Sequence, residues 1–197
     1  MLPPIPIEGL QGVGLVTVCM SGLPTYDAAQ SGTLDGMTER TLILLRHAKS
    51  VDPDPYPTDL ERPLSPRGRR DAVAAGEWLR AQGLEPDLVL CSTAVRTRET
   101  LAGLALSAAA APVVFEHRLY LGPAHDTLDL LRDGAPDVST LLVIGHNPTL
   151  SMLSDLLDPD ALPDEGLATS GIAVHVVPGT WRDLETAGLK AHHTARG

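Results

Sequence analysis

Two arginines and two histidines stand where predicted strands give way to loops or helices. Arg46 and His47 directly follow a short apolar run that is typical of a buried strand. Arg96 falls in the first turn of a predicted helix after a second such run, and His146 directly follows another. Arginine binds phosphate through a planar fork, and histidine can act as a nucleophile near neutral pH. These residue types indicate phosphoryl chemistry, provided that the fold brings them together.

Apolar runs and helix-cap signals predict the elements that would do so. Buried strands are expected at 41–45, 87–91, 112–115, 139–145 and 171–177, with an edge strand within 181–189. Helices are expected from a Ser65–Pro66 start to Gly83, from a Ser92 or Thr93 cap onward, at 124–132, and from Asn147–Pro148 to Leu157. This alternation predicts an α/β three-layer sandwich, a mostly parallel central sheet with helices on both faces. The carboxyl ends of its strands would then carry the four side chains beside helix N-termini, which favour anions.

Composition limits the classes of partner. The chain has 197 residues, 43% of them apolar, and a net charge of −10, which fits one globular domain. The negative charge argues against nucleic acid and anionic membranes as partners. Cys19 and Cys91 have no metal-type spacing and are expected to be free thiols in a reducing compartment. No apolar run approaches the length of a membrane span, so we expect a cytoplasmic protein without metal or cofactor.

The first 36 residues differ from the rest of the chain. They are rich in Gly, Pro, Ser and Thr and contain no Lys or Arg, so they lack the basic start of a secretory signal. Met37 stands directly before the first predicted strand and is a plausible natural start. We expect residues 1–37 to form a flexible tail, or to precede the natural start, and residues 38–197 to form the domain.

Four motifs in a fixed order resemble a known family: LLRHAKS at 44–50, RPLSPRG at 62–68, CSTAVRTRET at 91–100 and IGHNP at 144–148. Together they are similar to the histidine phosphatase superfamily, which has the phosphoglycerate mutase-like fold, and within it to SixA-type phosphohistidine phosphatases. The resemblance extends over nearly all of residues 39–177. It implies that His47 is the nucleophile and becomes phosphorylated. It also implies that Arg46, Arg96 and His146 bind the phosphoryl group.

Some positions depart from the family pattern. Ala48 replaces the common Gly after the nucleophile, although its side chain is still small. Mutase-like members carry a Glu acid after the third strand, and Glu116 is the nearest candidate here, whereas SixA-type members lack a clear equivalent. Arg62 and Asn147, within the second and fourth motifs, are further candidates for substrate binding. Asp59, in the proline-rich loop 51–64, would either position substrate or simply form a turn.

The resulting hypothesis is a metal-independent phosphatase that works through a phosphohistidine intermediate. Neutral His47 would attack phosphorus while its other ring nitrogen is held by a backbone carbonyl. Without a clear general acid, the most fitting substrate is phosphohistidine on a protein, because imidazole leaves more easily than an alkoxide. The short loop 51–64 would leave the site open to a protein surface. Two alternatives remain: a phosphatase of a small ester, such as a sugar or nucleotide phosphate, and a non-catalytic module that binds phosphoproteins.

Overall fold

A computed structural model describes residues 39–197 except 55, 57, 107–110, 135–137 and 160, and in these residues six strands form one sheet. The strands are β1 (Arg40–Arg46), β2 (Leu88–Ser92), β3 (Val113–Glu116), β4 (Thr140–Gly145), β5 (Gly171–Val177) and β6 (Gly188–Thr194). They lie in the order β3-β2-β4-β1-β5-β6. The pairs β1–β4, β2–β4 and β2–β3 are parallel, and β5 is antiparallel to both of its neighbours. The predicted tail, residues 1–37, lies outside the described residues.

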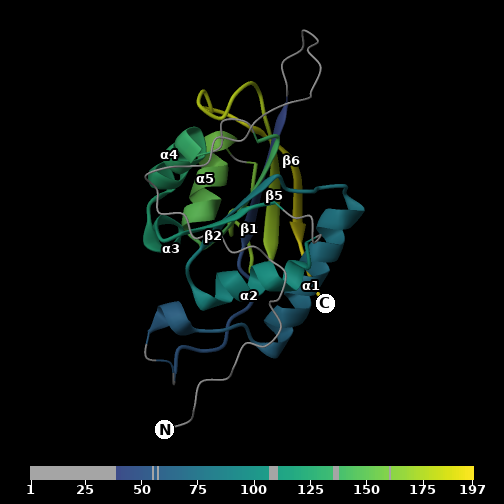
Figure 1. Cartoon of the computed structure of the whole chain (residues 1–197), viewed down its shortest axis with the longest axis vertical. Coiled ribbons are helices and arrows are strands. Elements are labelled where there is room, and N and C mark those ends of the chain that lie inside the picture. The colour runs from purple at the N-terminus through teal and green to yellow at the C-terminus, as the bar shows by residue number, and fades with distance from the viewer. Residues whose placement is uncertain (1–38, 55, 57, 107–110, 135–137, 160) are drawn as a thin grey trace.

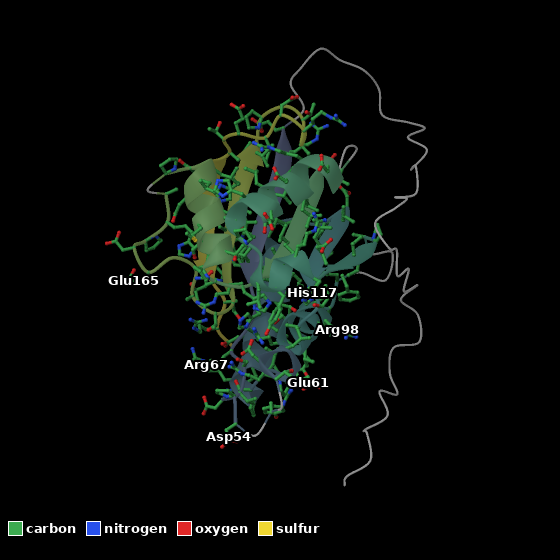
Figure 2. The ribbon with its side chains drawn as sticks, turned by 90° about the vertical axis from the view of Figure 1, so that its left-hand side faces the viewer. Asp54, Glu61, Arg67, Arg98, His117 and Glu165 are labelled. Carbon is green, nitrogen blue, oxygen red and sulfur yellow. The ribbon has the colours of Figure 1, made fainter. Side chains whose placement is uncertain are left out.

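Helices cover both faces of this sheet. They are α1 (Pro66–Ala81), α2 (Val95–Leu104), α3 (Arg118–Leu121), α4 (Ala124–Gly134) and α5 (Thr149–Leu157), with a 3-10 helix η1 (Asp59–Glu61) in the proline-rich loop. Figure 1 shows α4 and α5 on one side of the sheet and α1 on the other. Figure 2 shows the loop residues Asp54 and Glu61 at the same end of the molecule as Arg67 of α1. The predicted three-layer sandwich is therefore confirmed. Among the helices that the structure describes, none is long and apolar enough to cross a membrane.

Strand β1 shows why its sequence is apolar without interruption. Leu42 and Leu44 join the core cluster formed with α4 and α5, whereas Ile43 and Leu45 join the cluster formed with α1 and α2. All four side chains have no exposed surface, because helices cover both faces of the strand. Burying each such side chain contributes roughly 1.5–3 kcal/mol to folding. This burial anchors the strand whose end carries Arg46.

Helix α1 begins as its sequence predicts and lies close to the loop after β1. The Ser65 hydroxyl accepts a hydrogen bond from the Gly68 amide at 3.0 Å, and Pro66 occupies the first helical position. A Cβ atom at Gly68 would lie 2.0 Å from the Lys49 carbonyl oxygen. Only glycine therefore permits this approach, which fixes the RPLSPRG motif against the segment that follows His47.

Two predicted helix caps are wrong. The N-cap of α2 is Ala94, with no side-chain capping bond, rather than Ser92 or Thr93. Ser92 is fully buried at the end of β2, and its hydroxyl bonds a histidine of the site instead of the helix. At α5 the N-cap is Pro148, and the Asn147 side chain bonds a loop carbonyl. In both places the polar side chain that was predicted to cap the helix bonds a residue distant in sequence instead.

The last strand also lies later than predicted. The edge strand β6 spans Gly188–Thr194, whereas an edge strand was predicted within 181–189. Trp181 is instead fully buried, and its indole N–H donates to the Val138 carbonyl at 2.6 Å. Trp181 thus belongs to the core on the α4 and α5 side of the sheet, before the strand begins.

Candidate active site

The parallel pairing of strands brings the predicted site residues to one edge of the sheet. Arg46 ends β1 and lies opposite Gly145 at the end of β4, so His47 and His146 follow at the same level. Their ring centroids are 5.0 Å apart. Arg96 reaches the same place from the first turn of α2, which follows the neighbouring strand β2. The structure thus brings all four predicted side chains together at the carboxyl ends of β1, β2 and β4.

His47 is held as a neutral imidazole in one defined tautomer. Its Nδ1 lies 2.7 Å from the Ala48 carbonyl oxygen, so Nδ1 carries the proton and Nε2 carries the lone pair. The Arg96 Nε–H donates to Nε2 at 3.2 Å. Burial lowers the pKa of His47 to about 4, and the charges of Arg96 and Arg46 act in the same direction. At neutral pH this nitrogen is therefore unprotonated.

Ala48 and Thr100 fix the backbone directly after His47. Ala48 is buried against Leu64 and Ala72, which explains why only a small residue fits after the histidine. Its amide donates to the Thr100 hydroxyl at 3.0 Å, and that hydroxyl donates to the Arg96 carbonyl at 2.7 Å. Thr100 thereby joins the turn of His47 to the helix of Arg96. We did not select Thr100 from the sequence, although its spacing of four from Arg96 places both on one helix face.

Arg96 makes four contacts through its buried guanidinium group. Besides the bond to His47, its Nη2 lies 3.2 Å from His146 Nδ1. Its Nη1 donates to the Asp59 carbonyl at 2.6 Å, and Nη2 donates to Asp59 Oδ2 at 2.8 Å. Asp59, which the sequence left open between a turn former and a site residue, therefore lies in the site. The short proline-rich loop consequently reaches the site, although we expected it to leave the mouth open.

His146 is oriented from both sides. Its Nδ1 accepts from Arg96, so its Nε2 carries the proton and donates to the Ser92 hydroxyl at 2.9 Å. The pKa of His146 is lowered to about 3, mainly by burial and in smaller part by the neighbouring His47 and Arg96. His146 is neutral as well at pH 7. Arg96 thus selects the tautomer of His146, and Ser92 orients the ring by accepting its Nε2 proton, a role that no local sequence signal indicated.

Arg46 and Asn147 share one backbone acceptor. The Arg46 Nη1 donates to the Leu167 carbonyl at 2.7 Å, and the Asn147 Nδ2 donates to the same oxygen at 2.8 Å. Burial lowers the pKa of Arg46. Its Nε is buried and has no hydrogen-bond partner in the part of the chain that the structure describes. Leu167 therefore orients Arg46 while leaving a cationic N–H donor for another group.

Arg62 lies at the border of the site, and among the described residues Asp59 is the site residue to which it hydrogen-bonds. Its Nη1 donates to Asp59 Oδ1 at 2.5 Å, its Nη2 donates to the Ser50 hydroxyl at 2.7 Å, and Nε and Nη2 both contact the Val51 carbonyl. Partial burial acts to raise the pKa of Asp59, but bonds from Tyr120, Arg96 and Arg62 outweigh it and hold the pKa below its usual value. Asp59 is thus an ionised carboxylate between two arginines.

Glu116, the candidate general acid, is engaged elsewhere. It accepts bonds from the Arg118 amide at 2.9 Å and the Arg118 Nη2 at 3.0 Å. Burial acts to raise the pKa of Glu116, but these bonds, the Arg118 charge and that of His117 lower it overall. Among the described residues no hydrogen bond joins Glu116 to His47 or His146. An ionised carboxylate in an ion pair is poorly suited to donate a proton.

Tyr120 is a site residue that the sequence reasoning missed. Its hydroxyl donates to Asp59 Oδ2 at 2.9 Å, and burial together with Asp59 raises the pKa of this phenol. Its ring meets His146 edge-on with centroids 5.4 Å apart, and the Arg96 guanidinium lies 5.7 Å from the ring centroid. Tyr120 belongs to no motif, so only its position in the fold identifies it.

A cavity of 640 Å³ opens beside His146. Tyr120 and Asn147 contribute to its wall, and so do three apolar side chains that remain well exposed, namely Leu121, Met152 and Leu156. Exposed apolar side chains gathered next to polar groups are typical of binding surfaces. The cavity therefore offers an apolar surface directly beside His146.

A further histidine and a further arginine make their contacts away from the site. His175 is buried in the core, where it contacts the Ser154 hydroxyl at 2.8 Å and the Ala187 carbonyl at 2.9 Å. Arg98 is exposed, and its guanidinium lies 5.4 Å from the centre of the Phe115 ring. The described residues contain no group of three or more His, Cys, Asp and Glu that could hold a metal ion.

Comparisons with known proteins agree with this arrangement. A model of the histidine phosphatase superfamily (branch 1) matches residues 42–120. An uncharacterized protein of Mycobacterium tuberculosis is 42% identical over 162 residues, which cover 77% of this chain and all of the relative. A solved structure from Nakamurella multipartitia, named as a candidate phosphohistidine phosphatase SixA, is 36% identical with a TM-score of 0.73, covering 82% of this chain and 99% of that one.

A second solved structure extends the likeness in fold. The protein histidine phosphatase SixA complexed with tungstate superimposes with a TM-score of 0.64 at 22% identity, covering 78% of this chain and 96% of that one. The match over the first three motifs, the high identity to full-length relatives and the shared sheet agree with one another. The chain therefore belongs to the histidine phosphatase superfamily and is SixA-like in structure.

Proposed function

We propose that this phosphatase hydrolyses phosphohistidine on a protein through a phosphoryl group carried on His47. The observation that carries the proposal is the state of His47: its Nδ1 proton is held by the Ala48 carbonyl, and its unprotonated Nε2 accepts from Arg96 beside the ring of His146. A binding module would not need this buried, neutral nitrogen at the centre of an anion site. A nucleophile does need it.

The reaction takes two displacements. His47 Nε2 attacks phosphorus, a P–N bond forms to His47, and the P–N bond to the substrate histidine breaks as that imidazole takes up a proton. Arg46, whose Nε is unpartnered among the described residues, and Arg96 neutralise the equatorial oxygens as charge develops, with His146 beside them. Water then attacks phosphorus from the opposite side, the bond to His47 breaks, and inorganic phosphate leaves.

Two observations favour phosphohistidine over a small ester. Glu116 is ionised and bonded to Arg118, and an ester leaving as an alkoxide needs a general acid that an imidazole needs much less. The apolar side chains of Leu121, Met152 and Leu156 beside His146 suit a protein surface better than a sugar. The name of the Nakamurella multipartitia protein points to the same substrate class.

The test compares turnover of a phosphohistidine protein, an aryl phosphate and a sugar phosphate. We expect the phosphohistidine protein and the aryl phosphate to be hydrolysed faster than the sugar phosphate. His47→Ala should lose on the order of 10³-fold or more in kcat and fail to trap a phosphoryl group on rapid quenching. Glu116→Gln should change the phosphohistidine rate by less than about tenfold.

Three results would overturn the proposal. A strong preference for the sugar phosphate, abolished by Glu116→Gln, would support a small-ester phosphatase. Binding of the phosphoprotein without turnover of any of the three substrates would support a non-catalytic module. Retention of full activity by His47→Ala would exclude the covalent route through this residue.

A further inference from the structure

Asp59 places a negative charge on the arginine that the substrate needs. Its carboxylate Oδ2 lies 2.8 Å from Arg96 Nη2 and also accepts from the Tyr120 hydroxyl at 2.9 Å. Its other carboxylate oxygen, Oδ1, accepts a hydrogen bond from Arg62 Nη1 at 2.5 Å. Asp59 belongs to η1 in the proline-rich loop, and its side chain is 46% exposed although that of Arg96 is 7% exposed. The exposed loop thus places the Asp59 carboxylate against the buried guanidinium of Arg96.

The contacts of Arg96 show what this carboxylate competes with. The guanidinium gives Nε to His47, Nη2 to His146 and Asp59, and Nη1 to the Asp59 carbonyl. The donor on His47 Nε2 occupies the lone pair that must attack phosphorus. A phosphoryl oxygen can therefore accept a hydrogen bond from Arg96 only when Arg96 gives up some of these bonds. A carboxylate tethered by a short loop has an effective concentration in the millimolar range, so it competes strongly with a free anion.

On the basis of the proposed function, we infer that Asp59 is an intramolecular competitor that helps to expel product phosphate from Arg96 after each turnover. The substrate phosphoryl group displaces the carboxylate, aided by whatever contacts the rest of the substrate makes. Inorganic phosphate lacks those further contacts, so the returning carboxylate displaces it more easily. Tyr120 assists, because its hydroxyl holds Oδ2 at the arginine. Arg62 holds the other oxygen and keeps the carboxylate aligned.

The experiment measures binding of inorganic phosphate by titration calorimetry and its inhibition constant against an aryl phosphate. Asp59→Asn should tighten phosphate binding by about tenfold. In the wild type, molecules in which Arg96 is bonded to the Asp59 carboxylate cannot bind phosphate there and so lower the apparent affinity, and the variant lacks this carboxylate. Glu61→Gln is the matched control. It removes the same charge from the same 3-10 helix, but its carboxylate bonds only Thr58, at 3.0 Å, among the described residues. This control should change the affinity by less than about twofold.

A second variant tests the same inference without changing the charge of Asp59. Tyr120→Phe keeps the ring but removes the hydroxyl that holds the carboxylate, so it should tighten phosphate binding in the same direction by a smaller factor. Weaker phosphate binding by Asp59→Asn would overturn the inference and show that the carboxylate aligns Arg96 for phosphate. Equal effects of Asp59→Asn and Glu61→Gln would also overturn it, leaving only the loss of net charge. If the wild type neither binds phosphate nor turns over substrate, the proposed function and the inference about Asp59 are both wrong.

Discussion

Replacing Arg96 by lysine tests the phosphoryl clamp while keeping its charge. Arg96 directs three nitrogens to His47, His146 and Asp59 over distances of 2.6–3.2 Å, and its buried side chain fixes them in one plane. A lysine ammonium is a single point and cannot satisfy two phosphoryl oxygens in this geometry. The loss of one preorganised donor to the transition state costs roughly 2–4 kcal/mol. At about 1.4 kcal/mol for each factor of ten, Arg96→Lys should lower kcat/KM by about 30- to 1,000-fold.

The assay is steady-state hydrolysis of an aryl phosphate, with thermal unfolding to show that the variant is folded. Arg98→Lys is the matched control, because Arg98 lies two residues away in the same helix, is exposed and packs on Phe115. It should keep kcat/KM within about twofold. Vanadate should inhibit the wild type competitively, and Arg96→Lys should weaken this inhibition more than it raises KM. Normal kinetics for Arg96→Lys together with a defect in Arg98→Lys would show that the wrong arginine has been assigned.

Three further changes test the geometry around this clamp. Because burial lowers the pKa of His47 to about 4, its NMR titration should have a midpoint near pH 4, and a midpoint near 6.5 would contradict the burial argument. Since the unfolded chain binds this proton more readily, the free energy of unfolding should fall as pH drops from about 6.5 toward 4, as measured by denaturant titration. Ser92→Ala removes the partner of the buried His146 Nε2–H at 2.9 Å, so kcat/KM should drop roughly tenfold, whereas unchanged kinetics would exclude this orienting role. Gly76→Ala places a Cβ 2.1 Å from a backbone carbonyl of α2, so it should lower the free energy of unfolding by roughly 1–3 kcal/mol, whereas Gly188→Ala, with nothing within 4 Å, should lower it far less.

The order of strands and helices was predictable because its signals are local. The apolar run of β1 is buried on both faces, and the Ser65–Pro66 start of α1 satisfies amides of the helix to which it belongs. Such signals need no knowledge of distant partners. The predicted caps of α2 and α5 were wrong for the complementary reason. The Ser92 hydroxyl and the Asn147 amide have partners far away in sequence, His146 and Leu167, which local pattern cannot reveal.

The same division holds for the site. Parallel strands share one edge for their carboxyl ends, so residue types at strand ends were enough to predict that Arg46, His47, Arg96 and His146 meet. Tertiary structure alone decided how they are held. It tied Glu116 to Arg118 and brought Asp59 to Arg96 and Tyr120, a residue 61 positions away in sequence. Burial and hydrogen-bond partners select one tautomer and lower the pKa of each site histidine, and both depend on atoms that come together only when the chain is folded.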